Sequence, residues 1–167
     1  MTENARSGWR VALGLGVVLW VAGYAAMRCT MPAGVHRAAV QIAGPEGKPC
    51  LGVLYTLAAT PKAMIIVGHG VSCNTGVMAT IAKAFAAQGY VAVAVDFWGH
   101  GRSQERFNWM ANPAQVLAWC GWAKEHYPNL PLAYLGHSMG GFAGGAAFAE
   151  KPAAGAFVAM GAIPQRW

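Results

Sequence analysis

Charged residues are scarce in this chain of 167 residues. Lys and Arg number 12 and Asp and Glu only 6, so charged side chains make up 11% of the sequence and hydrophobic ones 56%. The net charge of +6 is scattered, and the sequence has no basic run or stripe of the kind that phosphate contacts need. The composition argues against nucleic acid as a partner. The basic residues are interpreted as a solvated, membrane-compatible surface.

Metal-binding patterns are also missing from the sequence. The four cysteines, Cys29, Cys50, Cys73 and Cys120, lack the paired spacing of metal sites, so we expect no metal and no other cofactor. Pairing of Cys50 with Cys73 in an oxidising compartment is left open by the sequence. Internal repeats and low-complexity segments are absent as well, and the length has room for one domain.

One uninterrupted stretch without charge lies near the N-terminus. Residues 1–10 are polar and basic, and residues 11–27 form an apolar run that would span roughly 25 Å as a helix. This pattern predicts a single-pass transmembrane signal anchor in a bacterial cytoplasmic membrane, with the following domain on the non-cytoplasmic side. The alternative is the hydrophobic region of a signal peptide that is cleaved, giving a secreted protein. Residues 28–37 would be a linker and residues 38–167 the domain.

Beyond the linker, apolar strand patterns alternate with helical ones. The expected strands lie in RAAVQIA, CLGVLYTL, PKAMIIVGHG, YVAVAVD, LPLAYLG and GAFVAMGAIP, and the expected helices cover 76–89, 112–128 and the segment after Ser138. Asn112 is expected to be an N-cap and Gly89 a C-cap. Two strands followed by strand-helix-strand units predict an α/β domain whose mainly parallel sheet is covered by helices on both faces.

The strand-to-helix junction near residue 138 carries the strongest chemical signal. Ser138 stands in the frame Gly136-His137-Ser138-Met139-Gly140. A serine at such a turn takes up a strained backbone conformation, and the flanking glycines avoid clashes as the chain reverses. The hydroxyl then projects above the carboxyl edge of the sheet. The amide of Met139, at the start of a helix, points to where an oxyanion would develop.

Two further motifs follow earlier strands in register. Gly68-His69-Gly70-Val71 comes after one strand, and Asp96-Phe97-Trp98-Gly99-His100-Gly101-Arg102-Ser103 comes after the next. Together with the serine turn, they resemble the α/β-hydrolase superfamily, in particular its monoacylglycerol-lipase-like and serine-aminopeptidase-like branch. The resemblance covers roughly residues 40–164 and implies the fold of that superfamily.

The resemblance also implies roles for individual residues. Ser138 would be the nucleophile, and the backbone N–H groups of Met139 and Val71 would form the oxyanion hole. The residues expected to shape the surrounding loops and the turn are His69, Gly70, Asp96, Gly136, His137 and Gly140. Asp96 would tie the amides of its own turn, and His100 is interpreted as structural.

The activating partners of the serine are missing from the sequence. In this superfamily the acid and the histidine follow the nucleophile, yet no histidine follows Ser138, and the only acid after it is Glu150. We therefore expect a sheet that is incomplete at its C-terminus and a truncated hydrolase with little activity as given. Loss of the base costs on the order of 10⁶ in kcat. A C-terminal segment or a second chain would be the missing partner.

The sequence leaves three functions open. The first is a membrane-anchored serine hydrolase acting on ester, lipid or peptide bonds of a small molecule through an acyl-enzyme at Ser138. The second is a catalytically silent, membrane-tethered domain that binds a ligand or partner through its pocket or its last strand. The third is a small enzyme in which His69 or His100 serves as an unconventional base.

Overall fold

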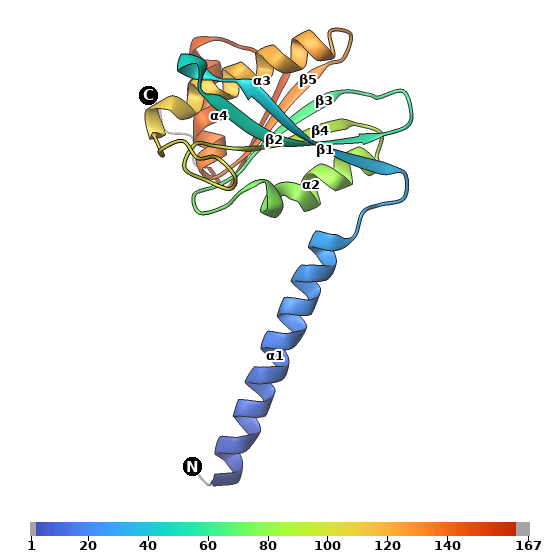
Figure 1. The fold of residues 1–167 in the computed structure, drawn as a ribbon, viewed down its shortest axis with the longest axis vertical. Helices are drawn as coiled ribbons and strands as arrows, with labels where there is room; N and C mark the ends of the chain where they lie inside the picture. The colour runs from blue at the N-terminus through green and yellow to red at the C-terminus, as the bar shows by residue number, and fades with distance from the viewer. Residues whose placement is uncertain (1–2, 163–167) are drawn as a thin grey trace. The chain divides into compact units, whose positions relative to one another are not determined.

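The computed structural model describes residues 3–162, and it describes the side chains of this range except those of residues 3–12, 27–29 and 150. The chain divides into two compact units, Met1–Thr30 and Met31–Trp167. Figure 1 shows the elements of each unit. The C-terminal residues PQRW lie outside the described part.

The first unit is the single helix α1, Glu3–Cys29. Every residue from 13 to 26 is exposed, including Leu19 and Trp20, and the Trp20 and Tyr24 rings stack at 5.8 Å. Among the described residues, no helix has both the length and the apolar character needed to cross a bilayer. The transmembrane segment expected over residues 11–27 is therefore not supported.

The second unit is built around one six-stranded sheet. Its strands are β1 (Val35–Ala43), β2 (Pro49–Leu57), β3 (Met64–Gly68), β4 (Val91–Asp96), β5 (Leu132–His137) and β6 (Ala156–Met160). They lie in the order β1-β2-β4-β3-β5-β6, with β1 and β2 antiparallel and the other four parallel to one another. The sheet is mixed, and the expected mainly parallel arrangement is confirmed.

Helices cover both faces of this sheet, as expected (Figure 1). Helix α2 (Thr75–Ala87) packs on one face, where its alanines meet the small residues of β4 in one core cluster. Helices α3 (Asn112–His126) and α4 (Met139–Glu150) lie on the other face over a larger cluster around Trp119 and Tyr134. Two short 3-10 helices, η1 (Pro45–Gly47) and η2 (Trp109–Ala111), complete the elements.

Two helix ends differ from the sequence expectation. Helix α3 begins at Asn112 with Ala111 as its N-cap, because the turn η2 leads directly into the helix, so Asn112 is not the cap. Helix α2 ends at Ala87 with Gln88 as its C-cap. Gly89 follows at φ +84°, the left-handed conformation typical of the residue just past a helix.

The last described strand, β6, lies at the edge of the sheet. All of its residues are exposed, and the exposed fraction reaches 52% at Val158 and 40% at Phe157. Apolar edge strands with free backbone groups are sites where further chain readily pairs. The opposite edge is the antiparallel strand β1, which packs against residues of both core clusters.

Candidate active site

The turn between β5 and α4 has the strained backbone that the sequence predicts for a nucleophile. Ser138 adopts φ +47° and ψ −112°, and the helix begins at the next residue. A non-glycine residue in this region costs about 1–3 kcal/mol and persists only where its surroundings hold it. Two hydrogen bonds hold it here: the Ser138 N–H donates to the Met160 carbonyl at 2.8 Å, and the Phe142 N–H donates to the Ser138 carbonyl at 3.0 Å.

The glycines on both sides of Ser138 are required by close backbone contacts. A Cβ on Gly136 would overlap the carbonyl of Gly140 and lie 2.5 Å from the nitrogen of Gly141. A Cβ on Gly140 would lie 2.8 Å from the Gly68 carbonyl. Helix α4 therefore starts directly against β3 and β5, at a distance that only glycine permits.

The loop after β3 lies beside this turn because β3 and β5 are neighbouring parallel strands. Gly68 pairs with Gly136 in the sheet, and the Gly140 N–H donates to the His69 carbonyl at 3.0 Å. A Cβ on Gly70 would lie 3.2 Å from the Cβ of Ser138, so this loop passes close to the serine. The strand order also reverses around β3, and in open α/β sheets ligands bind at such switch points.

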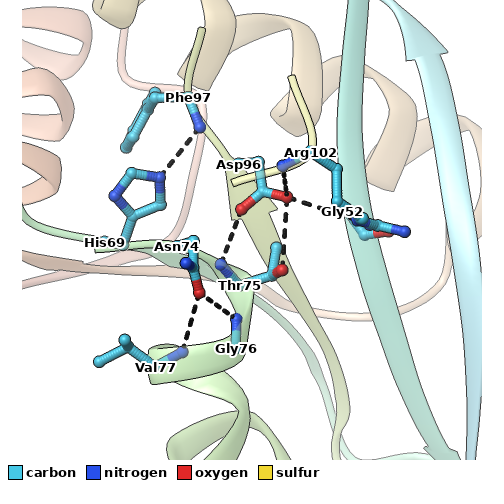
Figure 2. Close-up of polar contacts among 9 residues, drawn as sticks. All are labelled: Gly52, His69, Asn74, Thr75, Gly76, Val77, Asp96, Phe97 and Arg102. Atoms are coloured by element: carbon cyan, nitrogen blue, oxygen red, sulfur yellow. Dashed lines mark hydrogen bonds and ion pairs between the residues drawn. The ribbon is translucent and has the colours of Figure 1, made fainter. Parts of the chain in front are cut away.

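His69 ties the loop after β3 to the loop after β4. Its side chain is fully buried, and Nε2 accepts from the Phe97 N–H at 3.1 Å (Figure 2). The other ring nitrogen, Nδ1, lies 2.7 Å from the Gly70 carbonyl. A backbone N–H can only donate, so Nε2 carries no proton and Nδ1 donates. Burial lowers the pKa of His69, and the nearby His100 lowers it further. With both nitrogens engaged, His69 is not free to act as a base toward Ser138.

Asp96 organises backbone amides from two loops. Its carboxylate accepts from the Thr75 N–H at 2.7 Å and from the Arg102 N–H at 3.2 Å, and it also accepts from the Thr75 hydroxyl (Figure 2). The Arg102 Nε lies 3.6 Å from the carboxylate, while Nη2 of that guanidinium donates to the Gly52 carbonyl at 2.9 Å. The buried Asp96 thus fixes the turn after β4 to the start of α2 and to β2.

The two remaining histidines of the motifs lie against loops as well. The His100 Nδ1 is 3.1 Å from the Trp98 carbonyl, and its ring contacts the rings of His69 and Phe107. His137 fits between two glycines: its Nδ1 is 2.8 Å from where a Cβ of Gly70 would lie, and its Nε2 is 3.6 Å from the corresponding point on Gly161.

Val71 follows Gly70 in the loop after β3 and Met139 follows Ser138 at the start of α4, and their side chains have opposite surroundings. Val71 is 56% exposed, and Ser72 beside it adopts the left-handed φ of +59°. Met139 is buried in the core at the start of α4. Val71 thus lies in the loop that follows the carboxyl end of β3, and Met139 is the first residue of the helix that follows β5.

Sequence reasoning missed two buried contacts that support this region. The Tyr134 hydroxyl, from strand β5, donates to the Gly140 carbonyl in the first turn of α4 at 2.9 Å. The Gln115 Oε1 accepts from the Trp98 N–H at 3.1 Å and so anchors the loop after β4 to α3. A buried tyrosine and a glutamine on the apolar side of a helix are the signals that point to such contacts.

The cysteines carry no disulfide among the described residues. Cys50, Cys73 and Cys120 are free thiols, and burial raises the pKa of Cys50 and of Cys120 to about 11. The pairing of Cys50 with Cys73 that the sequence left open is not formed.

Three features together define the α/β-hydrolase class. They are the strained serine between β5 and α4, the loop after β3 packed against it, and the helices on both faces of the sheet. Residues 59–165 match the family described as Hydrolase_4, serine aminopeptidase S33. This match covers more than half of the chain, and the chain belongs to that family.

Individual relatives agree with this assignment. A monoacylglycerol lipase of Mycolicibacterium smegmatis is 30% identical over 59% of this chain and 37% of its own length, and the human monoglyceride lipase is 35% identical over 56% and 32%. The chain thus spans about a third of the length of these curated relatives. Among solved structures, a Pseudomonas aeruginosa protein of undescribed function has a TM-score of 0.69 at 19% identity, over 79% of this chain and 44% of its own. A cold-adapted esterase from an Arctic metagenomic library has a TM-score of 0.65 at 19% identity, over 78% and 62%. At these identities the solved structures establish the fold alone.

Proposed function

We propose that this domain is part of a serine hydrolase of ester or lipid bonds that forms an acyl-enzyme at Ser138. The observation that carries the proposal is the backbone of Ser138, φ +47° at a strand-to-helix turn, with the Gly70 loop against it. Strain of this kind, here at a half-buried residue, is a mark of functional sites. The lipase names of the relatives support an ester or lipid substrate in preference to a peptide.

The proposed reaction uses the serine oxygen as the nucleophile. Its attack on the ester carbonyl would form a C–O bond while the hydroxyl proton passes to a base, and the carbonyl oxygen would become an oxyanion. The N–H groups of Met139 and Val71 would donate to that oxyanion. Collapse of the intermediate would expel the alcohol with a proton returned by the base, and water would then release the acid by the same route.

We propose that the base of this reaction comes from outside residues 1–167. His69 has both ring nitrogens engaged, and no histidine follows Ser138. We propose that a histidine and an acid are supplied by a further segment or a second chain that adds next to β6. This strand is the neighbour of β5, and its Met160 pairs with His137, the residue before Ser138. Without them, turnover would fall by a factor on the order of 10⁶.

A fluorophosphonate probe tests this proposal. The full chain is treated with the probe alone and after co-expression with the C-terminal part of the Mycolicibacterium lipase that lies beyond the matched region. We expect intact-mass labelling of Ser138 only in the combined protein. The control variants are Ser138→Ala, which should not label, and Ser72→Ala, which removes a second serine of positive φ and should label normally. A folded combined protein that leaves Ser138 unlabelled contradicts the proposal.

The exposed strand β6 favours a second candidate function, a catalytically silent binding domain. Its apolar residues, Phe157, Val158 and Met160, are all more than a third exposed. In that case Val158→Lys would abolish binding of a partner strand while Ser138→Ala would change nothing. Loss of the biological effect in Ser138→Ala would exclude this candidate.

The location of the protein is a separate proposal. We propose single-pass attachment to a membrane through residues 11–27, with the domain on the non-cytoplasmic side, or secretion after cleavage. The exposed apolar side chains of residues 13–26 and the absence of charge in the run support attachment. Extraction of the native protein with alkaline carbonate distinguishes the cases: a span stays in the membrane pellet, and release into the supernatant contradicts it.

A further inference from the structure

An open groove of about 390 Å³ lies between the end of β1 and the second half of α3. Its lining comes from residues 41–43 of β1 and from Ala118, Trp122, Glu125 and His126 of α3. The residues of α3 are spaced by four, three and one positions, so they share one side of the helix. Pockets for small organic ligands have volumes of about 300–1,000 Å³, and the groove falls in this range. Ser138 is not part of the lining, so the groove is a place separate from the serine turn.

The wall on the β1 side includes free backbone groups. Strand β1 is at the edge of the sheet and pairs with β2 alone. The Gly44 N–H donates to the Lys48 carbonyl at 2.7 Å. Bonded pairs alternate along an antiparallel ladder, so the next bonded pair is Ile42 with Cys50. The N–H and C=O groups of the residues on either side of Ile42 therefore point away from β2, toward the free edge that lines the groove.

The wall on the α3 side carries two adjacent rings and an acceptor nitrogen. The rings of Trp122 and His126 lie 4.9 Å apart, with 31° between their planes. The His126 Nδ1 lies 3.0 Å from the Trp122 carbonyl oxygen. Because a carbonyl can only accept, Nδ1 carries the proton of the neutral imidazole, and Nε2 is left as an acceptor. This nitrogen is at the outer end of an exposed side chain.

The charges around the groove favour a cation. Glu125 contributes a carboxylate that forms no ion pair within the described residues, and no Lys or Arg belongs to the described lining. Helix α3 ends at His126, so the groove also lies along the last turns of the helix, where carbonyls without helical partners form the negative end of the helix dipole. Lys124 is in the same turn but is not a lining residue. An anion would find no counter-charge in this lining.

We propose that this groove binds an organic primary ammonium ion. Its N–H groups would donate to the Glu125 carboxylate, to Nε2 of His126 and to a free carbonyl of β1, and its alkyl chain would lie on Trp122 and Ala118. A primary ammonium fits better than a quaternary one, because every group named is an acceptor that requires an N–H donor. Free amines and lysine side chains share this group, and the test below separates them. The binding is independent of any reaction at Ser138.

Nuclear magnetic resonance on the full chain in a nonionic detergent at pH 8 tests the binding. The probes n-butylammonium, butyltrimethylammonium and 1-butanol carry the same alkyl chain and differ in charge and in N–H donors. The methyl groups of Ala43 and Ala118 report occupancy, and alanine methyl groups elsewhere in the chain serve as the reference. We expect saturable shifts at the two groove methyl groups, with about tenfold weaker binding of the two other probes. Equal affinity for all three probes, or no saturable shift with n-butylammonium, overturns the proposal.

A further probe identifies the source of the ammonium group. Nα-acetyl-lysine methylamide carries the same butylammonium chain on a peptide unit, which could also pair with the free edge of β1. Affinity at least about tenfold above that of n-butylammonium would identify a lysine side chain as the ligand. Equal or lower affinity would identify a free amine.

Variants provide a second measurement. Glu125→Gln removes the charge and keeps the shape of the side chain, so n-butylammonium should bind about threefold more weakly while 1-butanol is unaffected. His126→Phe keeps a ring beside Trp122 without Nε2 and should weaken binding by a similar factor. Glu105→Gln removes the same charge from the loop after β4 and should leave the affinity unchanged. Equal losses in Glu125→Gln and Glu105→Gln, or unchanged affinity in both groove variants, would contradict the proposal.

Discussion

Substitution of Gly136 by alanine should unfold the turn that carries Ser138. A Cβ at this position would overlap the Gly140 carbonyl and lie 2.5 Å from the Gly141 nitrogen, whereas ordinary contacts begin near 3.4 Å. The neighbours are backbone atoms of α4, which cannot rotate away as a side chain would. Relief requires a shift of the helix start by about 1 Å. Overpacking with flexible neighbours costs about 1–3 kcal/mol, and we expect a loss of at least about 3 kcal/mol here.

The matched control is Gly145→Ala in the same helix. No atom lies within 4 Å of a Cβ built on Gly145, so the substitution only improves helix propensity, by up to about 1 kcal/mol. Urea unfolding followed by circular dichroism measures both free energies. In thermal unfolding, 1 kcal/mol corresponds to a shift of about 4 °C in the midpoint temperature. That temperature should therefore drop by roughly 12 °C in Gly136→Ala and rise by about 4 °C in Gly145→Ala. A loss below about 1 kcal/mol in Gly136→Ala would refute the close approach of α4 to β5.

Three further perturbations follow from the buried polar groups. Asp96→Asn weakens charge-assisted bonds to the Thr75 and Arg102 amides, and urea unfolding should show a loss of about 2–4 kcal/mol. Burial lowers the pKa of His69, so below about pH 6.5 the unfolded state binds a proton that the folded state does not; stability is then constant above that pH and falls as the pH decreases, by at most about 1.4 kcal/mol per unit. His69→Gln should flatten this dependence, and an unchanged slope would contradict it. In a Cys29→Ser background, Ellman's reagent at pH 8 should titrate Cys73 at once and Cys50 and Cys120 only in denaturant, because burial raises the pKa of both thiols to about 11. Immediate reaction of all three thiols would show that the core is open.

Local patterns predicted the strands and the serine turn. The continuous apolar runs of β3 and β4 mark buried parallel strands, and the glycines around Ser138 mark a backbone conformation that only a tight reversal needs. The position of the loop after β3 also followed, because the strand order of such a sheet brings carboxyl ends together.

Contacts between distant residues were beyond the sequence. Thr75 and Asp96 are 21 residues apart, and nothing in the local pattern of either residue indicates that the amide of one meets the carboxylate of the other. The expected cap at Asn112 was wrong because η2 leads directly into α3 and places Ala111 at the cap. The Asn112 side chain instead accepts from the side chain of Gln115, whose other end is held by the Trp98 amide. Sequence spacing alone does not reveal whether such a side chain bonds a backbone amide or another side chain.

The backbone groups of Gly140 have a mechanical consequence for the site. The Gly140 N–H donates to the His69 carbonyl, and the Gly140 carbonyl accepts from the Tyr134 hydroxyl. These two bonds connect the first turn of α4 to the loop after β3 and to strand β5. A displacement of α4 along its axis would therefore drag the Gly70 loop with it. The Gly70 loop and the turn at Ser138 would then move together and keep their spacing.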